Sequence, residues 1–237
     1  MAPLDKQIVN SSYKYPRGRI LLFCKAPVPG QVKTRLIPAL GAEGACELHC
    51  RLVNHIAATL LEGNLCPIEF WVSPDANDRF FAPYHAVESI SLHCQTGKDL
   101  GQRMFNGVRE SLGPFEGAAK GRADYVLLIG SDCPALSVAY LDKALSRLEM
   151  GSDAVLGPAM DGGYVLLGLK RAEASLFRDI RWGSDTVCAE TCRRMNRLGW
   201  NWSLAKTLWD IDLPADLDRL HQIDLRQAGY RSKLVSK

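Results

Sequence analysis

Acidic residues in this chain stand where a divalent cation could be bound. Asp132 follows the apolar segment YVLLI at 125–129, which has the length of a buried strand. Asp210 and Asp212 would point to the same face of an extended segment, because side chains alternate along a strand. Proteins usually hold Mg²⁺ with one or two carboxylates together with phosphate oxygens of a substrate. We therefore take Asp132, Asp210 and Asp212 as candidate ligands for Mg²⁺ or Mn²⁺.

Two of these carboxylates also have a structural interpretation. Asp132 could cap the helix expected from about Val138, but it lies five residues before Ser137, where that helix would start. Asp212 could cap the closing helix, which would then have Pro214 in its first turn. This second interpretation suits Asp212 better than Asp210, and both interpretations of Asp212 stay open.

A cationic loop follows the first predicted strand. The apolar segment 20–24 leads into KAPVPGQVKTRL (25–36), where proline and glycine exclude a helix or a central strand. Ligands of open α/β sheets bind outside the carboxyl ends of the strands, so this loop is placed to bind phosphate groups. Gly30 permits close approach of a ligand, and Arg35 suits bidentate phosphate contact. Alternatively, its cations are solvated surface charges. The candidate phosphate-binding residues are Lys25, Pro27, Gly30, Lys33, Thr34 and Arg35.

Three further segments carry candidate site residues. The segment Asp161-Gly162-Gly163-Tyr164 has the composition of a tight hairpin turn, and such a turn can also present Asp161 and Tyr164 to an acceptor. Trp182 is either a core aromatic residue or a wall of the acceptor pocket. Asp99 is placed to cap the helix expected from Leu100, and with Arg103 it is a candidate nucleotide contact.

The order of the predicted elements indicates an α/β protein. Strands are expected at 20–24, 68–72, 89–95, 125–129, 153–156, 164–169 and 202–205. Helices are expected at 43–61, 100–112, 138–148 and 185–198, with a closing helix from about Pro214. This alternation is typical of a mostly parallel sheet with helices on both faces. The strands on either side of Asp161 are joined too closely for a helical crossover, so an antiparallel insertion is expected there.

Composition excludes several classes of protein. The chain has 237 residues, 47% hydrophobic and 23% charged, which suits one globular domain at 19–237 preceded by a flexible arm at 1–18. The net charge of +3 is too small to indicate a nucleic-acid-binding protein. Residues 1–19 are polar, so we expect no signal peptide, and no apolar run approaches membrane-spanning length. The eight cysteines form no C-x-x-C pair, so we expect reduced, mostly buried thiols in a cytoplasmic protein.

Six ordered segments carry a resemblance to a known family. They are KAPVPGQVKTRL, QTGKDLGQRM, GSDCPAL, GPAMDGGYVLLGL, RWGSDTV and WDIDLPADL, and they extend over residues 20–217. Together they resemble the transferase-1 family of cytoplasmic glycosyltransferases, some of which are linked to arsenosugar biosynthesis. That family belongs to the GT-A, or nucleotide-diphospho-sugar transferase, superfamily, which is related to the 2-phospholactate and molybdenum-cofactor guanylyltransferases.

The resemblance implies a GT-A fold, a mixed and mostly parallel sheet with helices on both faces. It implies that the loop at 25–36 binds the phosphates of a nucleotide or nucleotide sugar, and that Asp132 is the metal aspartate. Asp210 and Asp212 would complete the metal site. The segment Asp161–Tyr164, with Gly162 and Gly163, would line the side where a small-molecule acceptor binds. No nucleic acid and no membrane partner is implied.

Two activities follow from these expectations. The first is a metal-dependent glycosyltransferase, with Asp132, Lys33 and the general base Asp161 as candidate catalytic residues. The second is a nucleotidyltransferase that joins a nucleoside triphosphate to a phosphorylated or carboxylated acceptor and releases pyrophosphate. Typical GT-A glycosyltransferases have Asp-x-Asp where this chain has Ser131-Asp132-Cys133, and a single aspartate is closer to the guanylyltransferases. A nucleotide-binding module without catalysis ranks last.

Overall fold

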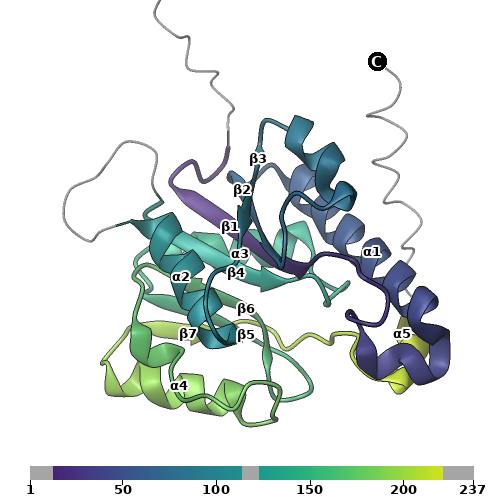
Figure 1. The fold of residues 1–237 in the computed structure, drawn as a ribbon. Coiled ribbons are helices and arrows are strands. Elements are labelled where there is room, and N and C mark those ends of the chain that lie inside the picture. Colours follow the sequence, from purple (N-terminus) through teal and green to yellow (C-terminus); the bar gives the residue numbers. More distant parts are fainter. Residues whose placement is uncertain (1–12, 114–122, 221–237) are drawn as a thin grey trace, which may run out of the picture.

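A seven-stranded mixed sheet forms the centre of the protein (Figure 1). The structure is a computed structural model and describes residues 13–113 and 123–220. The strands are β1 (Gly18–Lys25), β2 (Ile68–Ser73), β3 (Ile90–Cys94), β4 (Tyr125–Gly130), β5 (Ala154–Pro158), β6 (Tyr164–Leu169) and β7 (Trp202–Leu204). Their order across the sheet is β3-β2-β1-β4-β6-β5-β7.

Most neighbouring strands are parallel. β1 pairs in parallel with β2 and β4, β2 with β3, and β5 with β7. Only β6 runs antiparallel to its neighbours β4 and β5. The antiparallel insertion around Asp161 is therefore confirmed, and its reason is the short connection at 159–163. The expected mixed and mostly parallel sheet is likewise confirmed.

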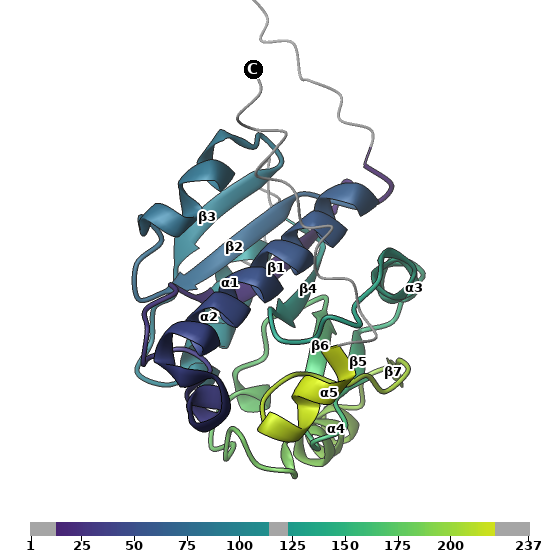
Figure 2. The same cartoon turned by 90° about the vertical axis from the view of Figure 1, so that its right-hand side faces the viewer.

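Helices cover both faces of the sheet. The helices are α1 (Ile37–Gly63), α2 (Leu100–Leu112), α3 (Val138–Glu149), α4 (Val187–Arg197) and α5 (Leu217–Leu220). Four short 3-10 helices accompany them: η1 (Thr34–Leu36), η2 (Arg79–Ala86), η3 (Ala174–Leu176) and η4 (Pro214–Asp216). Buried residues of α1 and α3 share one hydrophobic cluster, and those of α2 and α4 share a second cluster on the opposite face. Figure 2 shows α1 lying across β1 and β2.

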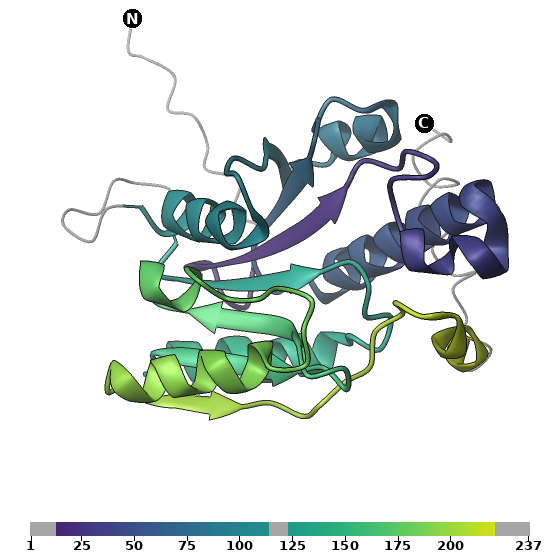
Figure 3. The ribbon, with the colours of Figure 1, turned by 60° about the horizontal axis from the view of Figure 1, so that its bottom comes forward.

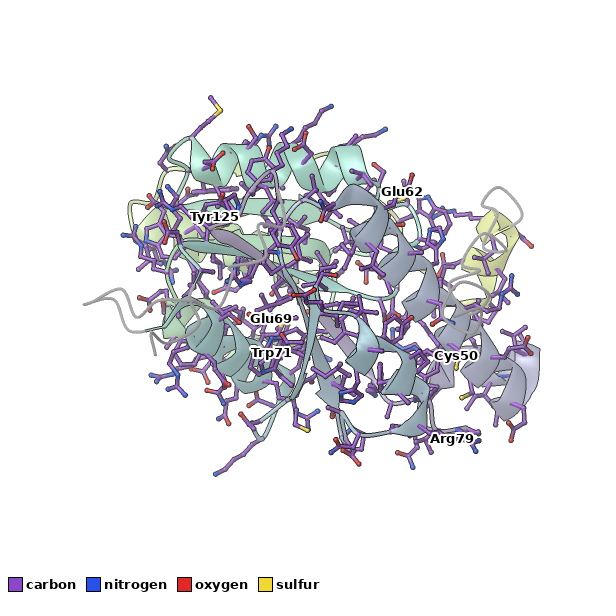
Figure 4. All side chains as sticks on the ribbon, turned by 90° about the horizontal axis from the view of Figure 1, so that it is seen from above. Cys50, Glu62, Glu69, Trp71, Arg79 and Tyr125 are labelled. Carbon is purple, nitrogen blue, oxygen red and sulfur yellow. The ribbon has the colours of Figure 1, made fainter. Side chains whose placement is uncertain are left out.

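The central strands alternate between these two clusters. Along β1, Ile20 and Leu22 join the cluster of α1 and α3, whereas Leu21 and Phe23 join that of α2 and α4. A strand buried on both faces has no polar face, which explains why β1 and β4 read as continuous apolar runs. Trp71 on β2 belongs to the second cluster, and its indole nitrogen donates to Glu69 (Figure 4).

A third, smaller cluster joins the two ends of the described chain. Ile211 packs with Leu36, Leu48 and Leu52, and Leu217 lies against them. In Figures 1 and 3, α5 accordingly lies beside the beginning of α1. This packing brings the segment after β7 back to the loop that follows β1.

Several boundaries differ from those expected from the sequence. Helix α1 begins at Ile37 rather than near 43, because η1 leads directly into it and Gly41, with φ 71°, only kinks it. Residues 1–12 of the expected N-terminal arm lie outside the described residues. The described part of that arm is packed rather than loose: Tyr15 is buried, and its amide donates to the carbonyl of Leu65.

Two expectations about membranes and thiols can be compared with the described residues. None of the helices there is long and apolar enough to cross a membrane. All eight cysteines are free, as expected, and most of them are buried or partly buried.

Candidate active site

One cavity of about 460 Å³ lies at the carboxyl ends of the central strands and brings most of the candidate residues together. From the loop after β1 it is lined by Lys25, Lys33, Thr34 and Arg35. The carboxylates on its wall are Asp132, Asp161, Asp210 and Asp212. Cations and carboxylates therefore face a common space, although they come from distant parts of the sequence.

The central contact of the cavity is an ion pair between the two sides. Lys33 Nζ lies 2.8 Å from Asp132 Oδ1 and donates to the carbonyl oxygen of Ile211 at 2.5 Å. The Lys33 side chain is only 4% exposed, while that of Asp132 is about half exposed at 48%. Lys33 also has a left-handed backbone, with φ 47°, which is uncommon for a residue with a side chain and is often found at functional sites.

Asp132 is held ionised by this arrangement. Burial acts to raise the pKa of the Asp132 carboxyl, but the adjacent Lys33 ammonium, together with smaller contributions such as the Ser131 hydroxyl, holds that pKa below its ordinary value. The side-chain oxygen of Ser137, not that of Asp132, caps α3 by accepting from the amide of Tyr140. Asp132 is thus not the cap of that helix, and it points a carboxylate to the cavity.

The segment 210–212 lies directly beside Asp132. The amide of Ile211 donates to the backbone carbonyl of Asp132 at 3.0 Å. Asp212 forms an ion pair with Arg35, and its amide donates to Asp216, which also accepts from Leu213 at the start of η4. Asp216 therefore supplies the helix cap that the sequence alternatively suggested for Asp212.

Asp210 is the carboxylate with the least compensation. Burial, together with the negative charges of Asp161 and Asp132, raises the pKa of Asp210 to about 6. A cation placed between Asp210 and its acidic neighbours would stabilise the ionised form of the Asp210 carboxylate. This feature could not be read from the sequence, because it depends on three segments meeting.

The donor set fits a metal that is shared with a substrate rather than a preformed metal site. No group of three or more His, Cys, Asp or Glu side chains in the described residues converges as metal ligands. Asp132 and Asp210 nevertheless line the same cavity, and carboxylate oxygens are the ligands that Mg²⁺ prefers. One or two carboxylates plus substrate phosphates are the usual Mg²⁺ environment, and these residues can supply that share.

Tyr164 and Trp182 form an aromatic part of the cavity wall. Their rings meet edge to face with centroids 6.3 Å apart, and the Tyr164 hydroxyl lies 4.0 Å from the sulfur of Met104. Burial raises the pKa of Tyr164, so its hydroxyl stays protonated. Trp182 belongs partly to the core of α2 and α4 and also lines the cavity, so both interpretations of it apply.

The turn at 159–163 is held in place by α4. A side chain at Gly162, where φ is 90°, would overlap the backbone of Asp185, and the amide of Cys188 donates to the Gly162 carbonyl. Asp161 accepts from the amide of Gly163 and is exposed at the rim of the cavity. The hairpin interpretation and the site interpretation of this turn are thus compatible.

Some candidate residues shape the cavity without lining it. Asp99 accepts from the amide of Gln102 and caps α2, as expected. Pro27, Gly30 and Gly162 are absent from the cavity wall, while Arg103 and Gly163 belong to it. Arg103 donates to the carbonyl of Gly97 and to the hydroxyl of Ser73, both at 3.2 Å.

Sequence reasoning missed several polar residues of the wall, among them His49 and Gln95. His49 is buried in α1, and its Nε2 lies 2.9 Å from the carbonyl oxygen of Lys25. Burial lowers the pKa of His49, so the neutral ring donates this hydrogen bond. Gln95 donates to two strand carbonyls beside the cavity. His49 lies within the helix expected at 43–61, and Gln95 begins the segment QTGKDLGQRM, but neither residue type at its position indicates a place on the cavity wall.

One family profile matches a large part of the chain. The family described as "Uncharacterized protein conserved in bacteria (DUF2064)" matches residues 56–184, which is more than half of the sequence. The matched range includes Asp132, Asp161 and Trp182. No curated protein matches the sequence.

Solved structures match the whole architecture. A protein of Desulfovibrio desulfuricans G20, provisionally described as a nucleotide-diphospho-sugar transferase, has 26% identity and a TM-score of 0.74 over 92% of this chain and 96% of its own. A nucleotidyl transferase from Methanothermobacter has 18% identity and a TM-score of 0.58 over 89% and 99%. The 4-diphosphocytidyl-2C-methyl-D-erythritol synthase of Anaerococcus prevotii DSM 20548 has 10% identity and a TM-score of 0.56 over 86% and 96%. The last two similarities concern the fold alone.

Proposed function

The chain belongs to the DUF2064 family, and we propose that it is a transferase that moves a sugar from a nucleoside-diphosphate sugar to a small acceptor. The observation that carries this proposal is the cavity in which Lys33 meets Asp132 at the carboxyl ends of β1 and β4. The six segments that resemble the transferase-1 glycosyltransferases and the similarity to the Desulfovibrio protein support it.

The cations bind the leaving group in this proposal. Lys33 and Arg35 are paired with Asp132 and Asp212, and a diphosphate entering the cavity would compete with these carboxylates for them. Arg35 can make two parallel hydrogen bonds to a phosphate, whereas Lys33 acts as a buried point charge. Both contacts would stabilise the negative charge that develops on the departing nucleoside diphosphate.

Mg²⁺ or Mn²⁺ is part of the proposal, and Asp132 and Asp210 are the residues that would hold it. The ion would supply positive charge to the phosphate oxygens. When the phosphates draw Lys33 and Arg35 away from their partners, the carboxylates lose their compensating charges. Nucleotide binding and cation binding would therefore favour each other.

The acceptor side is formed by the turn at Asp161 and by Tyr164 and Trp182. Asp161 is exposed at the cavity rim. Its Oδ1 accepts from the amide of Gly163, and within the described part of the chain its second carboxylate oxygen has no hydrogen-bond donor. It is our candidate for the base that removes a proton from an acceptor hydroxyl if the reaction inverts the sugar configuration. The rings of Tyr164 and Trp182 offer an apolar surface with polar edges to the acceptor.

Nucleotidyl transfer is the second candidate, and one observation favours it. Asp132 has Ser131 and Cys133 as neighbours rather than a second aspartate, so its acidic partner comes from the distant residue Asp210. In that reaction the same cations would stabilise charge at the α-phosphate while pyrophosphate leaves.

A product assay separates the two candidates. The protein is incubated with Mg²⁺ and a panel of nucleotide sugars and nucleoside triphosphates in the presence of a mixture of small hydroxylated acceptors, and products are identified by mass spectrometry. Release of a nucleoside diphosphate supports glycosyl transfer, and release of pyrophosphate supports nucleotidyl transfer. Asp132→Asn is the control for contaminating activity. A panel with no nucleotide consumed by the unaltered protein would contradict both candidates.

A further inference from the structure

We propose that Gln95 determines which nucleobase the cavity accepts, by presenting a fixed hydrogen-bond acceptor to an N–H group of the base. This inference rests on the proposed function, because it requires the cavity to bind a nucleotide. Gln95 follows β3 and lies on the cavity wall, away from the acidic residues near β4.

The orientation of the Gln95 amide is determined by the sheet. Its Nε2 donates to the carbonyl of Trp71 at 2.8 Å and to that of Cys24 at 3.2 Å, while its backbone amide donates to Val72 at 2.8 Å. A primary amide has two hydrogens, and both are used on these carbonyls. The opposite orientation would place Oε1 against two carbonyl oxygens with no hydrogen between them, which is unfavourable.

The fixed orientation leaves one polar atom for a ligand. Within the residues that the structure describes, Oε1 of Gln95 has no hydrogen-bond partner, although the side chain lines the cavity. An acceptor that cannot rotate to become a donor is satisfied only by an N–H or O–H group. Nucleobases offer such groups on their edges, as amino or ring N–H donors. A rigid acceptor rejects bases that present an acceptor at this position, because two facing oxygens or nitrogens would remain unpaired.

The position of Gln95 suits the base rather than the phosphates. Phosphates are expected near Lys33 and Asp132, at the ends of β1 and β4. Strand β3 is separated from β4 by β2 and β1, so at the usual strand spacing the two ends lie about 14 Å apart. A nucleotide lying across the strand ends would place its diphosphate over β4 and its base at β3. Arg103, which is held at Ser73 on β2, lies between these ends.

Substitution of Gln95 separates base recognition from phosphate binding. Gln95→Met keeps the size of the side chain but removes the acceptor and both donors. Gln95→Lys keeps donors for the two carbonyls and replaces the acceptor with a positive charge; it tests the same idea if Gln95→Met fails to fold, because the preference for a base is measured relative to ribose 5-triphosphate. Gln102→Met is the matched control, because Gln102 lies nearby in α2 but does not line the cavity.

The measurement is calorimetric titration with four nucleoside triphosphates and with ribose 5-triphosphate, which lacks a base. We expect the unaltered protein to prefer a base over ribose 5-triphosphate, and both Gln95 variants to reduce that preference about tenfold, equivalent to one hydrogen bond. Both Gln95 variants should still bind ribose 5-triphosphate. The Gln102→Met variant should keep the preference of the unaltered protein for a ligand with a base. Unchanged base preference in the folded Gln95 variants overturns this inference while leaving the proposed function standing. If the unaltered protein binds neither the triphosphates nor the corresponding nucleoside diphosphates, the proposed function fails and this inference fails with it.

Discussion

The Lys33 ammonium lies between the Asp132 carboxylate, at 2.8 Å, and the carbonyl oxygen of Ile211, at 2.5 Å. One buried cation thus joins the loop after β1, the end of β4 and the segment after β7. Arg35 makes a parallel but more exposed connection to Asp212. These two contacts have different surroundings, so their removal should have different consequences for stability.

Lys33→Ala and Arg35→Ala should both weaken nucleotide binding, but only Lys33→Ala should destabilise the fold. Each lost charge-assisted hydrogen bond to a phosphate costs about 1.5–3 kcal/mol of binding free energy. Lys33→Ala also removes the ammonium that donates to the Ile211 carbonyl and pairs with Asp132, which should cost about 1–3 kcal/mol of unfolding free energy. The exposed pair of Arg35 should contribute about 0–1 kcal/mol. Calorimetry and urea unfolding measure the two effects.

Lys98→Ala is the matched control for this pair of variants. Lys98 is exposed in the neighbouring loop and does not line the cavity. It should leave both nucleotide affinity and unfolding free energy unchanged. Unaltered affinity in Lys33→Ala and Arg35→Ala would remove the phosphate role of the loop.

The Asp210 carboxylate should make stability depend on pH between about pH 4 and pH 6. Its pKa is raised to about 6, so the folded protein binds a proton that the unfolded chain has already released. Stability contributed by the protonated form is present at low pH and is lost as pH rises through the folded pKa. Asp210→Asn should therefore raise the unfolding free energy above about pH 6, by about 1–2 kcal/mol once solvent screening is considered.

Below about pH 4 the difference between this variant and the unaltered protein should vanish, because Asp210 is then protonated in both the folded and the unfolded state. Urea unfolding at a series of pH values measures this trend. Asp218→Asn, an exposed change on α5, should show no such pH dependence. Equal effects of Asp210→Asn at pH 4 and pH 7.5 would contradict the assignment of the shifted carboxylate.

Most of the fold could be predicted from the sequence because local signals agree with tertiary packing. α2 begins and ends where Asp99 and the helical spacing predicted, and β4 and β6 start at the expected residues. The start of α1 was predicted too late, because proline and glycine usually interrupt helices. Here Pro38 lies in the first turn of α1, and Gly41 lies at its kink. The 3-10 helix η3 was also missed, because three residues carry no periodic signal.

Candidate site residues could be predicted only where a charged residue suited to ligand binding lies in the segment after a strand. Asp132 and Lys33 were selected in this way, and the structure brings both to one cavity. Their direct pairing, the capping of η4 by Asp216 rather than Asp212, and the contacts of Gln95 depend on distances between segments far apart in sequence. Such distances are decided by packing, above all by Ile211 entering the cluster of Leu36.

Gly101→Ala should damage the acceptor wall. A β-carbon at Gly101 would overlap the carbonyl oxygen of Phe177 and would lie 2.8 Å from Trp182 Nε1. In an open helix the same change would stabilise by about 1 kcal/mol. Here we expect a loss of more than about 1 kcal/mol of unfolding free energy from overpacking and a displaced Trp182. Urea unfolding and tryptophan fluorescence report these two effects.

Gly130→Ala is the control for that substitution, since nothing lies within 4 Å of the added β-carbon. It should leave the unfolding free energy nearly unchanged. A Gly101→Ala variant as stable as Gly130→Ala, with the same fluorescence spectrum as the unaltered protein, would show that α2 and Trp182 are not tightly fitted.

The last prediction concerns the order in which metal and nucleotide bind. In the described residues, Lys33 neutralises Asp132 and Arg35 neutralises Asp212, so only Asp210 faces the cavity with a strongly disfavoured charge. A divalent cation that binds without nucleotide would have to compete with the Lys33 ammonium and the Arg35 guanidinium for these carboxylates. A nucleotide changes the balance, because its phosphates attract Lys33 and Arg35 and also supply oxygen ligands.

Mn²⁺ should therefore bind weakly to the free protein and at least about tenfold more tightly with a bound nucleoside diphosphate, which corresponds to about 1.4 kcal/mol of coupling free energy. Electron paramagnetic resonance of free Mn²⁺ measures both affinities. Asp132→Asn should abolish the gain, because it removes the carboxylate that follows the carboxyl end of β4, whereas Asp218→Asn should keep it. Equal Mn²⁺ affinity with and without nucleotide, or an undiminished gain in Asp132→Asn, would refute the shared metal site. If Asp218→Asn keeps the gain in Mn²⁺ affinity and Asp132→Asn loses it, the coupling depends on the carboxylate at the carboxyl end of β4.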